Sequence, residues 1–289
     1  MASRKMVYKI KKWQKMFVYL FNSIFANRPR YLRIKMNHEI KHDGKFTYYE
    51  AGEGTPIVIL HGLMGGLSNF ESVADYLVAQ GHKVLMPELP LYTQSLLKTN
   101  VKAFSRFVKD FIVYKGLDRV VLLGNSLGGH IALYITKMYP EKVAGLVLTG
   151  SSGLYESAMG DSYPKRGDYQ YIKNKTESVF YDPNTATKEM VDEIFALVND
   201  RIKVIKTVTI AKSAIRHNMA KDLPKMHVKT CLIWGKNDAV TPPEVAEEFH
   251  KLMPNSNLFW IDKCGHAAMM EHPAEFNKIV GEWLEKVEL

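Results

Sequence analysis

Short apolar runs recur along the body of the chain, and amphipathic stretches separate them. Each run holds four to seven residues with few polar side chains, which is typical of strands buried on both faces of a parallel sheet. The stretches between them carry apolar residues at spacings of three and four, which predicts helices. The predicted strands are 56–60, 83–86, 119–123, 143–149, 230–234 and 258–261, and the predicted helices are about 67–80, 99–115, 127–139, 243–252 and 273–287.

This alternation of strands and helices predicts βαβ units, and hence a mostly parallel central sheet flanked by helices, in the α/β class. Before the first buried strand, residues 31–41 and 45–51 alternate enough to form two further strands, with a turn at Asp43 and Gly44. The sequence contains no internal repeat and no low-complexity linker.

One long stretch interrupts the alternation, between the predicted strands that end near Gly150 and begin near Thr230. Residues 153–175 are rich in Gly, Ser, Asp and Tyr, whereas residues 185–218 have a helical pattern. Because a structureless loop of this length is unusual in a compact domain, we predict a mainly helical cap inserted over one end of the sheet. The expected organisation is an N-terminal extension at 1–36, a core in two parts at 37–152 and 228–289, and the cap at 153–227.

Charge and hydropathy set the N-terminal extension apart. The chain has a formal net charge of +9, yet ten basic residues and no acidic residue lie before Glu39, so the rest is close to neutral. We therefore expect no nucleic-acid partner for the body. Residues 5–26 have an apolar stripe with Trp13 and Phe17 beside basic positions, which suits a membrane interface. Three alternatives stay open: a helix packed on the protein's own body, a peripheral membrane contact, or a signal peptide or other targeting segment.

Composition narrows the class of protein. Apolar residues make up 46% and charged residues 24% of the 289 residues, which argues against wholesale disorder and against a polytopic membrane protein. Two cysteines cannot build a disulfide framework. His266 and His272 are six residues apart, which is not the spacing of a zinc-binding helix. We expect neither a metal nor a cofactor, and a cytoplasmic location with membrane association or export left open.

A serine sits between the predicted strand 119–123 and the predicted helix 127–139, within the sequence Gly-Asn-Ser-Leu-Gly. In a Gly-x-Ser-x-Gly turn of this kind, a strained backbone holds the serine hydroxyl clear of the sheet. The amide of Leu127 opens the helix and can face a developing negative charge. Ser126 is therefore the predicted nucleophile; the alternative is a serine that only caps the helix.

The glycine-rich turn from His61 to Gly66 follows the first buried strand. Such a turn lets the backbone approach a substrate carbonyl closely, and the amide of Leu63 is the predicted second donor of an oxyanion hole. A phosphate-binding loop is excluded because no Gly-Lys-Ser/Thr follows. We expect His61 to be structural and to bond this loop.

An aspartate and a histidine follow the last two predicted strands. Asp238 lies in the loop after 230–234, and His266 lies in the loop after 258–261. With Ser126, they occur in the chain order Ser, Asp, His, which is the order expected for a hydrolase with a serine elbow of this kind. We predict that His266 takes the proton of the serine and that Asp238 orients the imidazole ring. Asp262 is the competing acid.

These motifs together resemble the α/β-hydrolase fold superfamily over roughly residues 40–288. The elbow Gly-Asn-Ser-Leu-Gly-Gly and the cap stretch at 179–183 are similar to the meta-cleavage-product hydrolases, which cut a carbon–carbon bond in a vinylogous diketone acid. That family usually has Trp after the histidine, where this chain has Ala267. It also uses a cap arginine to hold the substrate acid, for which Arg201 and Arg216 are the candidates.

The triad predicts a serine hydrolase that cleaves an ester-like carbonyl substrate with an apolar group through an acyl-enzyme. The expected partner is a small molecule, and the oligomeric state stays open. Alternatives are a carbon–carbon hydrolase or an acyltransferase on the same triad, or a non-catalytic scaffold on this fold. The predicted substrate pocket is apolar, and its residues are Met64, Asn125, Phe180 and Met269.

Overall fold

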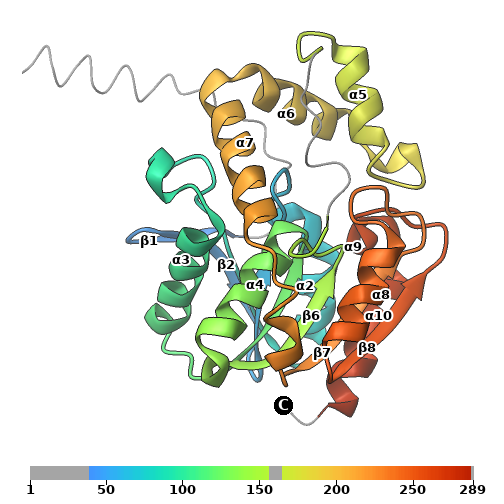
Figure 1. Cartoon of the computed structure of the whole chain (residues 1–289). Helices are drawn as coiled ribbons and strands as arrows, with labels where there is room; N and C mark the ends of the chain where they lie inside the picture. The colour runs from blue at the N-terminus through green and yellow to red at the C-terminus, as the bar shows by residue number, and fades with distance from the viewer. Residues whose placement is uncertain (1–38, 156–164, 288–289) are drawn as a thin grey trace, which may run out of the picture. The chain divides into compact units, whose positions relative to one another are not determined.

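The computed structural model of the chain describes residues 39–155 and 165–287. Their strands are β1 Lys41–Asp43, β2 Phe46–Ala51, β3 Pro56–Leu60, β4 Lys83–Pro87, β5 Val120–Asn125, β6 Val143–Thr149, β7 Lys229–Gly235 and β8 Ser256–Ile261. They form one eight-stranded sheet in the order β1-β2-β4-β3-β5-β6-β7-β8 (Figure 1). β2 pairs antiparallel with both of its neighbours, and the strands from β4 to β8 in that order pair in parallel. The predicted α/β class with a mostly parallel sheet is confirmed.

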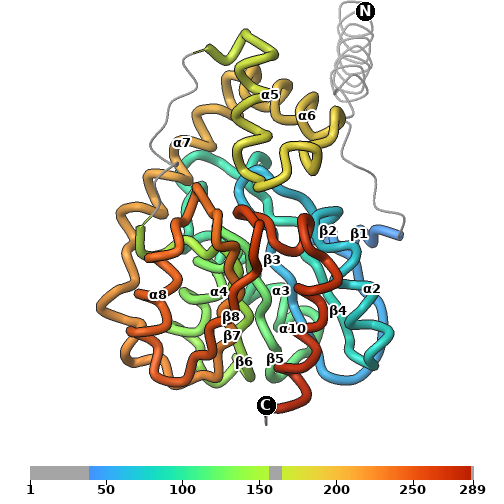
Figure 2. The backbone as a smooth tube through the Cα atoms, turned by 90° about the vertical axis from the view of Figure 1, so that its right-hand side faces the viewer, coloured from blue at the N-terminus to red at the C-terminus, as the bar shows by residue number. Residues whose placement is uncertain are grey.

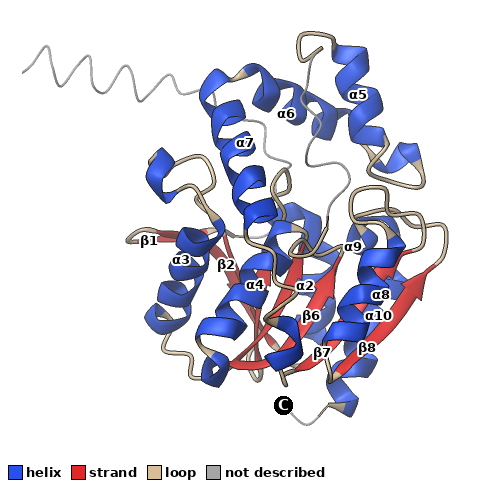
Figure 3. Ribbon diagram, viewed as in Figure 1, coloured by secondary structure: helices blue, strands red, loops and turns tan. Residues whose placement is uncertain are grey.

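Helices cover both faces of the sheet (Figure 3). Helices α3 Val101–Tyr114, α4 Leu127–Met138 and α8 Pro243–Leu252 share one apolar cluster with one side of the strands. Helices α2 Glu71–Ala79, α9 Ala268–Glu271 and α10 Pro273–Lys286 share a second cluster with the other side. Because successive side chains of a strand point to opposite faces, the continuous apolar runs of the sequence supply both clusters at once.

The strands show this alternation residue by residue. In β5, Leu122 belongs to the cluster of α3 and α4, whereas Val121 and Leu123 belong to the cluster of α2 and α10. All three side chains are fully buried. Burial on both faces explains why the central strands have so few polar positions in the sequence.

The described residues between β6 and β7 contain the helices α5 Tyr169–Glu177, α6 Lys188–Asn199 and α7 Arg201–Arg216. They lie over the edge of the sheet at which the parallel strands have their carboxyl ends, and the view turned by 90° shows them on the same side (Figures 1 and 2). This inserted segment is the feature that the sequence predicted as a helical cap, and we call it the cap below. Short 3-10 turns complete the chain: η1 Leu67–Phe70, η2 Leu96–Lys98, η3 Pro140–Lys142, η4 Pro183–Thr185 and η5 Leu223–Lys225.

The structure corrects two local expectations. The first hairpin turns at Gly44 and Lys45, one residue later than expected, because the register pairs Asp43 with Phe46. Helix α5 starts inside the stretch 153–175, whose polar composition hides it; Asp168 caps it by accepting the amide of Tyr171.

The structural predictions for the N-terminal extension at 1–36, including its amphipathic part at 5–26, lie outside the described residues. Within 39–155 and 165–287, none of the helices combines the length and the hydrophobicity that a membrane span requires.

Candidate active site

Ser126 occupies the sharp turn between β5 and α4. Its backbone has φ 53° and ψ −119°, a conformation that costs a non-glycine residue free energy and that is found at functional turns. Two glycines make the turn feasible: a Cβ at Gly124 would collide with the backbone of Gly128, and a Cβ at Gly128 would collide with the carbonyl of Leu60. The serine side chain makes no capping hydrogen bond to α4, so the alternative of a plain helix cap is not what the structure contains.

Asn125 joins the elbow to two neighbouring segments. Its side-chain amide donates to the carbonyl of Thr149 at 3.0 Å and to the carbonyl of His266 at 3.2 Å. The amide of Ser126 also bonds the carbonyl of Thr149, at 3.2 Å. Asn125, predicted as a pocket residue, thus uses its side chain to hold the end of β6 and the histidine loop beside the elbow.

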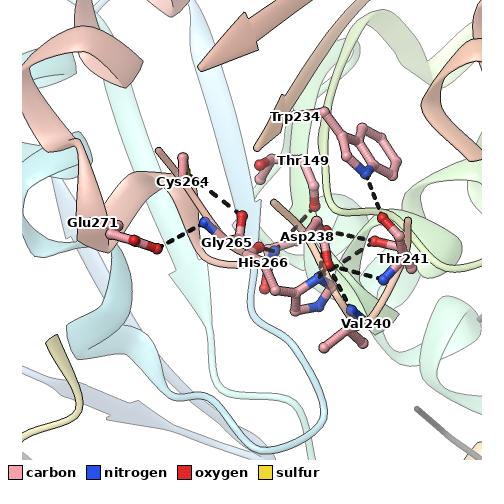
Figure 4. Close-up of polar contacts among 10 residues, drawn as sticks. Thr149, Trp234, Asp238, Val240, Thr241, Cys264, Gly265, His266 and Glu271 are labelled. Carbon is pink, nitrogen blue, oxygen red and sulfur yellow. Dashed lines mark hydrogen bonds and ion pairs between the residues drawn. The ribbon is translucent and has the colours of Figure 1, made fainter. Parts of the chain in front are cut away.

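The second part of the site is a buried pair of side chains, Asp238 and His266 (Figure 4). His266 Nδ1 lies 2.9 Å from one carboxylate oxygen of Asp238 and 3.1 Å from the other. The carboxylate also accepts the amides of Val240 and Thr241, at 2.8 and 2.9 Å, and the Thr241 hydroxyl at 2.8 Å. Several donors satisfy the buried charge, and the proton on Nδ1 leaves Nε2 of His266 as the acceptor.

Thr241 is a site residue that sequence reasoning missed. Its hydroxyl bonds Asp238 and lies 3.3 Å from His266 Nδ1. Its carbonyl accepts the indole N–H of the fully buried Trp234 at 2.8 Å. The only sequence signal is the position of Thr241 three residues after Asp238, which is typical of a side chain that closes an aspartate turn.

Ser126 and His266 are both placed against the end of β6. A Cβ added at Gly150, directly after β6, would lie 2.8 Å from Nδ1 of the His266 ring, while Ser126 bonds the preceding carbonyl of Thr149. Ser126 and His266 are 7% and 8% exposed, so both remain within reach of a small molecule. Among the described residues, the Ser126 hydroxyl makes no hydrogen bond, as is common before a substrate draws serine and histidine together.

His61 holds the glycine-rich turn through both ring nitrogens. Nε2 accepts the amide of Leu89 at 3.0 Å, and Nδ1 lies 2.9 Å from the carbonyl oxygen of Gly62. These partners require a neutral ring with the proton on Nδ1. The C=O and N–H of a trans peptide point in opposite directions, so the bond to the Gly62 carbonyl fixes the direction of the Leu63 amide. The structural role predicted for His61 agrees with these contacts.

The turn lies next to the elbow. A Cβ at Gly62 would be 3.4 Å from Cβ of Ser126, so the Leu63 amide belongs to the segment in contact with the serine. Leu127 is the first residue of α4, and the first amides of a helix have no acceptor within the helix. The two residues whose amides are predicted as oxyanion donors therefore belong to the segments next to Ser126, and their catalytic role stays a prediction.

Tyr92 and Lys206 connect the cap to this turn, and neither was predicted. The Tyr92 hydroxyl lies 3.2 Å from the Leu63 carbonyl and 3.2 Å from the hydroxyl of Thr207 on α7. The buried Lys206, also on α7, donates to the carbonyls of Tyr92 and Gln94 at 2.7 and 2.6 Å. These hydrogen bonds join α7 to the loop after β4, and that loop to the glycine-rich turn.

Glu271 connects the cap to the histidine loop, and it too was missed. One carboxylate oxygen accepts the amides of Tyr181 and Asp182 in the cap, at 2.8 and 2.9 Å, and the other accepts the amide of Gly265 at 2.9 Å (Figure 4 shows the Gly265 bond). The amide of His266 bonds the carbonyl of Val179 at 2.9 Å. The backbone of the cap therefore lies directly on the loop that carries His266.

The other predicted pocket residues have mixed surroundings. Met64, in the glycine-rich turn, is half-buried. Phe180 is half-buried in the cap and packs against the cluster of α2, α9 and α10. Met269 is 2% exposed and is part of that cluster, so its described contacts are those of a core residue.

The alternative acid Asp262 lies on the surface, and the two cysteine thiols are buried and protonated at neutral pH. Asp262 is 71% exposed and faces Lys236 at 3.6 Å. Burial, followed by nearby carboxylates, raises the pKa of the Cys264 thiol to about 12, so this thiol is protonated at neutral pH. Burial also raises the pKa of Cys231. In the part of the chain that the structure describes, no three His, Cys, Asp or Glu side chains converge on a metal-binding position.

Comparison with known proteins places this geometry in a family. A sequence profile of the alpha/beta hydrolase fold matches residues 55–273. A solved alpha/beta hydrolase enzyme from the metagenome of sediments of the lagoon of Mar Chica, Morocco, is 58% identical, with 86% of this chain and 99% of that chain covered and a TM-score of 0.72.

Two further relatives are more distant. A 2-hydroxy-6-oxononadienedioate/2-hydroxy-6-oxononatrienedioate hydrolase from a Pseudomonas species is 27% identical over 264 residues, which cover 84% of this chain and 93% of that protein. A meta-cleavage product hydrolase from Pseudomonas fluorescens IP01 shares the fold at 18% identity and a TM-score of 0.71, with 84% of this chain and 95% of that chain covered. The resemblance inferred from the motifs is confirmed: the chain belongs to the alpha/beta hydrolase fold family of hydrolase enzymes.

Proposed function

We propose that this hydrolase cleaves an ester-like carbonyl substrate that carries an apolar group, with Ser126 as nucleophile, His266 as base and Asp238 as the residue that orients the base. The observation that carries the proposal is the buried Asp238–His266 pair, with Nδ1 2.9 and 3.1 Å from the two carboxylate oxygens. This arrangement leaves Nε2 free to accept a proton. The strained backbone of the elbow also supports the proposal, because such a turn presents a nucleophilic serine to a substrate, whereas a serine without a catalytic role does not need it.

The proposed reaction has two steps. The oxygen of Ser126 attacks the substrate carbonyl and its proton moves to Nε2 of His266, while the amides of Leu63 and Leu127 stabilise the oxyanion. The tetrahedral intermediate collapses to an acyl-enzyme, and the alcohol leaves with the proton from His266. Water then attacks the acyl group, again losing a proton to His266, and the acid is released with Ser126 restored.

Two arginines bear on the substrate class. In the resemblance to the meta-cleavage-product hydrolases, Arg201 and Arg216 were the candidates to hold a substrate acid. Both are exposed on α7, whereas Thr207 and Ile210 face the protein. A neutral ester needs no such arginine, and the tryptophan that the meta-cleavage-product hydrolases usually have after the histidine is replaced here by Ala267. These features favour the ester over a diketone acid.

Carbon–carbon cleavage is the second candidate. It is favoured by the Pseudomonas relative, whose name describes hydrolysis of a hydroxy-oxo-dienedioate. The same triad can serve both reactions, since each needs an activated serine or water at a carbonyl carbon. The two proposals differ in whether the substrate carries a carboxylate in addition to the carbonyl group that reacts.

A substrate panel tests the proposal. Wild-type protein is assayed with p-nitrophenyl esters of increasing acyl length and with a 2-hydroxy-6-oxo-dienoic acid. Ser126→Ala should lower kcat/KM for the preferred ester by about a thousandfold or more, and the control Ser178→Ala, at an exposed cap position, should not. Undiminished turnover by Ser126→Ala would remove the nucleophile. A preference for the dienoic acid would show that the substrate is a diketone acid and not an ester. Transfer of the acyl group to an added alcohol in place of water would indicate an acyltransferase.

A further inference from the structure

Helix α7 exposes an apolar face to solvent. Its inward side chains, including Thr207, Ile210 and Ala214, are buried. On the opposite face Ile202 is 65%, Ile205 45%, Val208 44% and Ile215 54% exposed. A surface helix normally has charged and polar residues on its solvent side. The outward face of α7 is therefore unusual.

The charged residues of α7 are all basic. The helix contains no aspartate or glutamate. Lys206 uses its charge inward, on the carbonyls of Tyr92 and Gln94, but Arg201, Lys212 and Arg216 are exposed between the aliphatic positions. Within the described residues, none of these three cations has an ion-pair partner.

The loop before α3 extends this face. It runs beside α7, because Lys206 bonds the carbonyl of Gln94 and the amide of Val101 bonds the hydroxyl of Ser213 at 3.3 Å. Between these two contacts, Leu96 is 51% and Leu97 91% exposed. The α7 surface is the set Leu96, Leu97, Lys98, Lys102, Arg201, Ile202, Ile205, Val208, Lys212, Ile215 and Arg216.

The neighbouring helix α6 has the opposite character. The exposed Glu189 and the half-buried Asp192 make it acidic. Asp192 accepts hydrogen bonds from Lys188 at 2.6 Å and from the hydroxyl of Tyr169 at 2.6 Å. Unpartnered cations and exposed aliphatic side chains are combined on α7, and α6 shows that this is not a general property of the cap.

The chemistry of the α7 surface selects its partner. A second copy of the same face would bring like charges together. A nucleic acid would use the cations but not the aliphatic side chains, since bases stack on aromatic residues. An anionic bilayer matches both kinds of residue: lysine and arginine attract the headgroups, and isoleucine and leucine enter the boundary of the acyl chains.

We propose that the α7 surface docks the protein on an anionic lipid bilayer. On the opposite side of the same helix, Lys206 bonds the carbonyl of Tyr92 and Thr207 bonds its hydroxyl. The Tyr92 hydroxyl also contacts the carbonyl of Leu63 in the glycine-rich turn. Docking through α7 places the cap, and the candidate active site beneath it, at a membrane surface where apolar substrates concentrate. All residues of this surface lie in the body of the protein, so the proposal is independent of the membrane contact considered for the sequence at 5–26.

Vesicle flotation of the full chain tests the proposal. The lipids are phosphatidylcholine alone and phosphatidylcholine with about 30% phosphatidylglycerol, at low and high salt. Wild type should float with the anionic vesicles at low salt and lose most of this binding at high salt. Ile205→Ser with Val208→Ser, and separately Lys212→Glu with Arg216→Glu, should each weaken binding about tenfold or more. Ester hydrolysis in buffer and the unfolding midpoint should not change, because these side chains are exposed.

The matched control is Lys278→Glu with Lys286→Glu. It makes the same change of charge on α10, where both lysines are 74% exposed, and it should leave vesicle binding within about twofold of wild type. Equal loss in the control and in the α7 charge variant would assign the binding to net charge and overturn the proposal. Unchanged binding in both α7 variants would assign any binding to another segment. A lipid-free dimer that the α7 variants abolish would assign the surface to a second copy.

Discussion

Apolar burial stabilises the interior of the sheet core, whereas hydrogen bonds from polar side chains fasten the cap to that core. The core has apolar side chains on both faces of its central strands, and residues such as Leu122, Val147 and Trp234 are fully buried. The cap is tied to the core by polar side chains that bind backbone groups, with Glu271 on three amides and Lys206 on two carbonyls. Hydrophobic burial is non-directional and tolerant, whereas these hydrogen bonds fix one geometry.

The difference matters because the site lies where the two regions meet. Ser126, Asp238 and His266 all follow carboxyl ends of core strands. The hydrogen bonds that fasten the cap end at the same site. Glu271 accepts the amide of Gly265, which precedes His266, and the Tyr92 hydroxyl donates to the carbonyl of Leu63. The core should therefore set the stability of the protein, and the polar ties should set the precision of the site.

The largest expected effect comes from emptying the core. Trp234→Ala removes a fully buried side chain that packs on Phe249, with ring centroids 5.8 Å apart, and it removes the bond to the Thr241 carbonyl. The free energy of unfolding should fall by about 3–5 kcal/mol, measured by urea denaturation. The control Trp260→Ala, in the half-buried part of β8, should cost clearly less. Equal costs would contradict the dominance of burial in the core.

The second effect comes from breaking the tie at Glu271. In Glu271→Gln one of the bound amides faces an NH₂ group, so a donor loses its acceptor; the expected cost is about 2 kcal/mol. Because Gly265 precedes His266, kcat for the ester should fall about tenfold or more while the KM changes less. Glu275→Gln, one turn away on α10, is the control. A loss of stability without a change in kcat would reduce Glu271 to a structural role.

The third expected effect is a pH dependence of the stability, which comes from a buried histidine where the core meets the end of α7. His130 of α4 is fully buried, and its Nε2 contacts the carbonyl of His217 at the end of α7 at 3.0 Å. Burial, and then the charge of His217, lower the pKa of His130 from 6.5 to about 4. Between these values the unfolded chain binds a proton that the folded ring refuses, so stability is lost as the pH falls from about 6.5 to about 4.

His130→Gln removes this titration. Wild type should lose about 2 kcal/mol more than the variant between pH 7 and pH 5, measured by urea denaturation at both values. Equal losses in the two proteins would show that the ring binds its proton as readily in the folded state as in the unfolded state, despite its burial on α4 against the end of α7.

The smallest effect is expected from the tie at Lys206. Lys206→Met keeps the length and apolar part of the side chain but removes the bonds to the carbonyls of Tyr92 and Gln94. The unfolding free energy should fall by about 1–2 kcal/mol, and the KM for the ester should rise more than kcat falls, because the loop that supports the oxyanion turn loosens. Lys212→Met, exposed on the same helix, should change neither constant.

Local patterns carried most of the fold. The apolar runs located the six central strands, and helical spacing located α3, α4, α8 and α10 to within about two residues. Helix α5 was missed, because its sequence Tyr-Gln-Tyr-Ile-Lys-Asn-Lys-Thr-Glu carries only one buried side chain, Ile172. A helix with so small a buried face has a weak periodic signal.

Glycine spacing and hydrophobic periodicity are properties of neighbours along the chain, so the strands, the elbow and the chain order of Ser126, Asp238 and His266 could be predicted from them. The roles of Glu271, Lys206 and Tyr92, and the face of α7 that meets solvent, depend on contacts that form only in the folded protein. Glu271 binds the amides of Tyr181 and Asp182, which are 90 and 89 positions away, and Lys206 binds carbonyls that are 114 and 112 positions away. Almost every residue offers the same backbone groups, so a pattern of side-chain types cannot show which of them a carboxylate or an ammonium will meet.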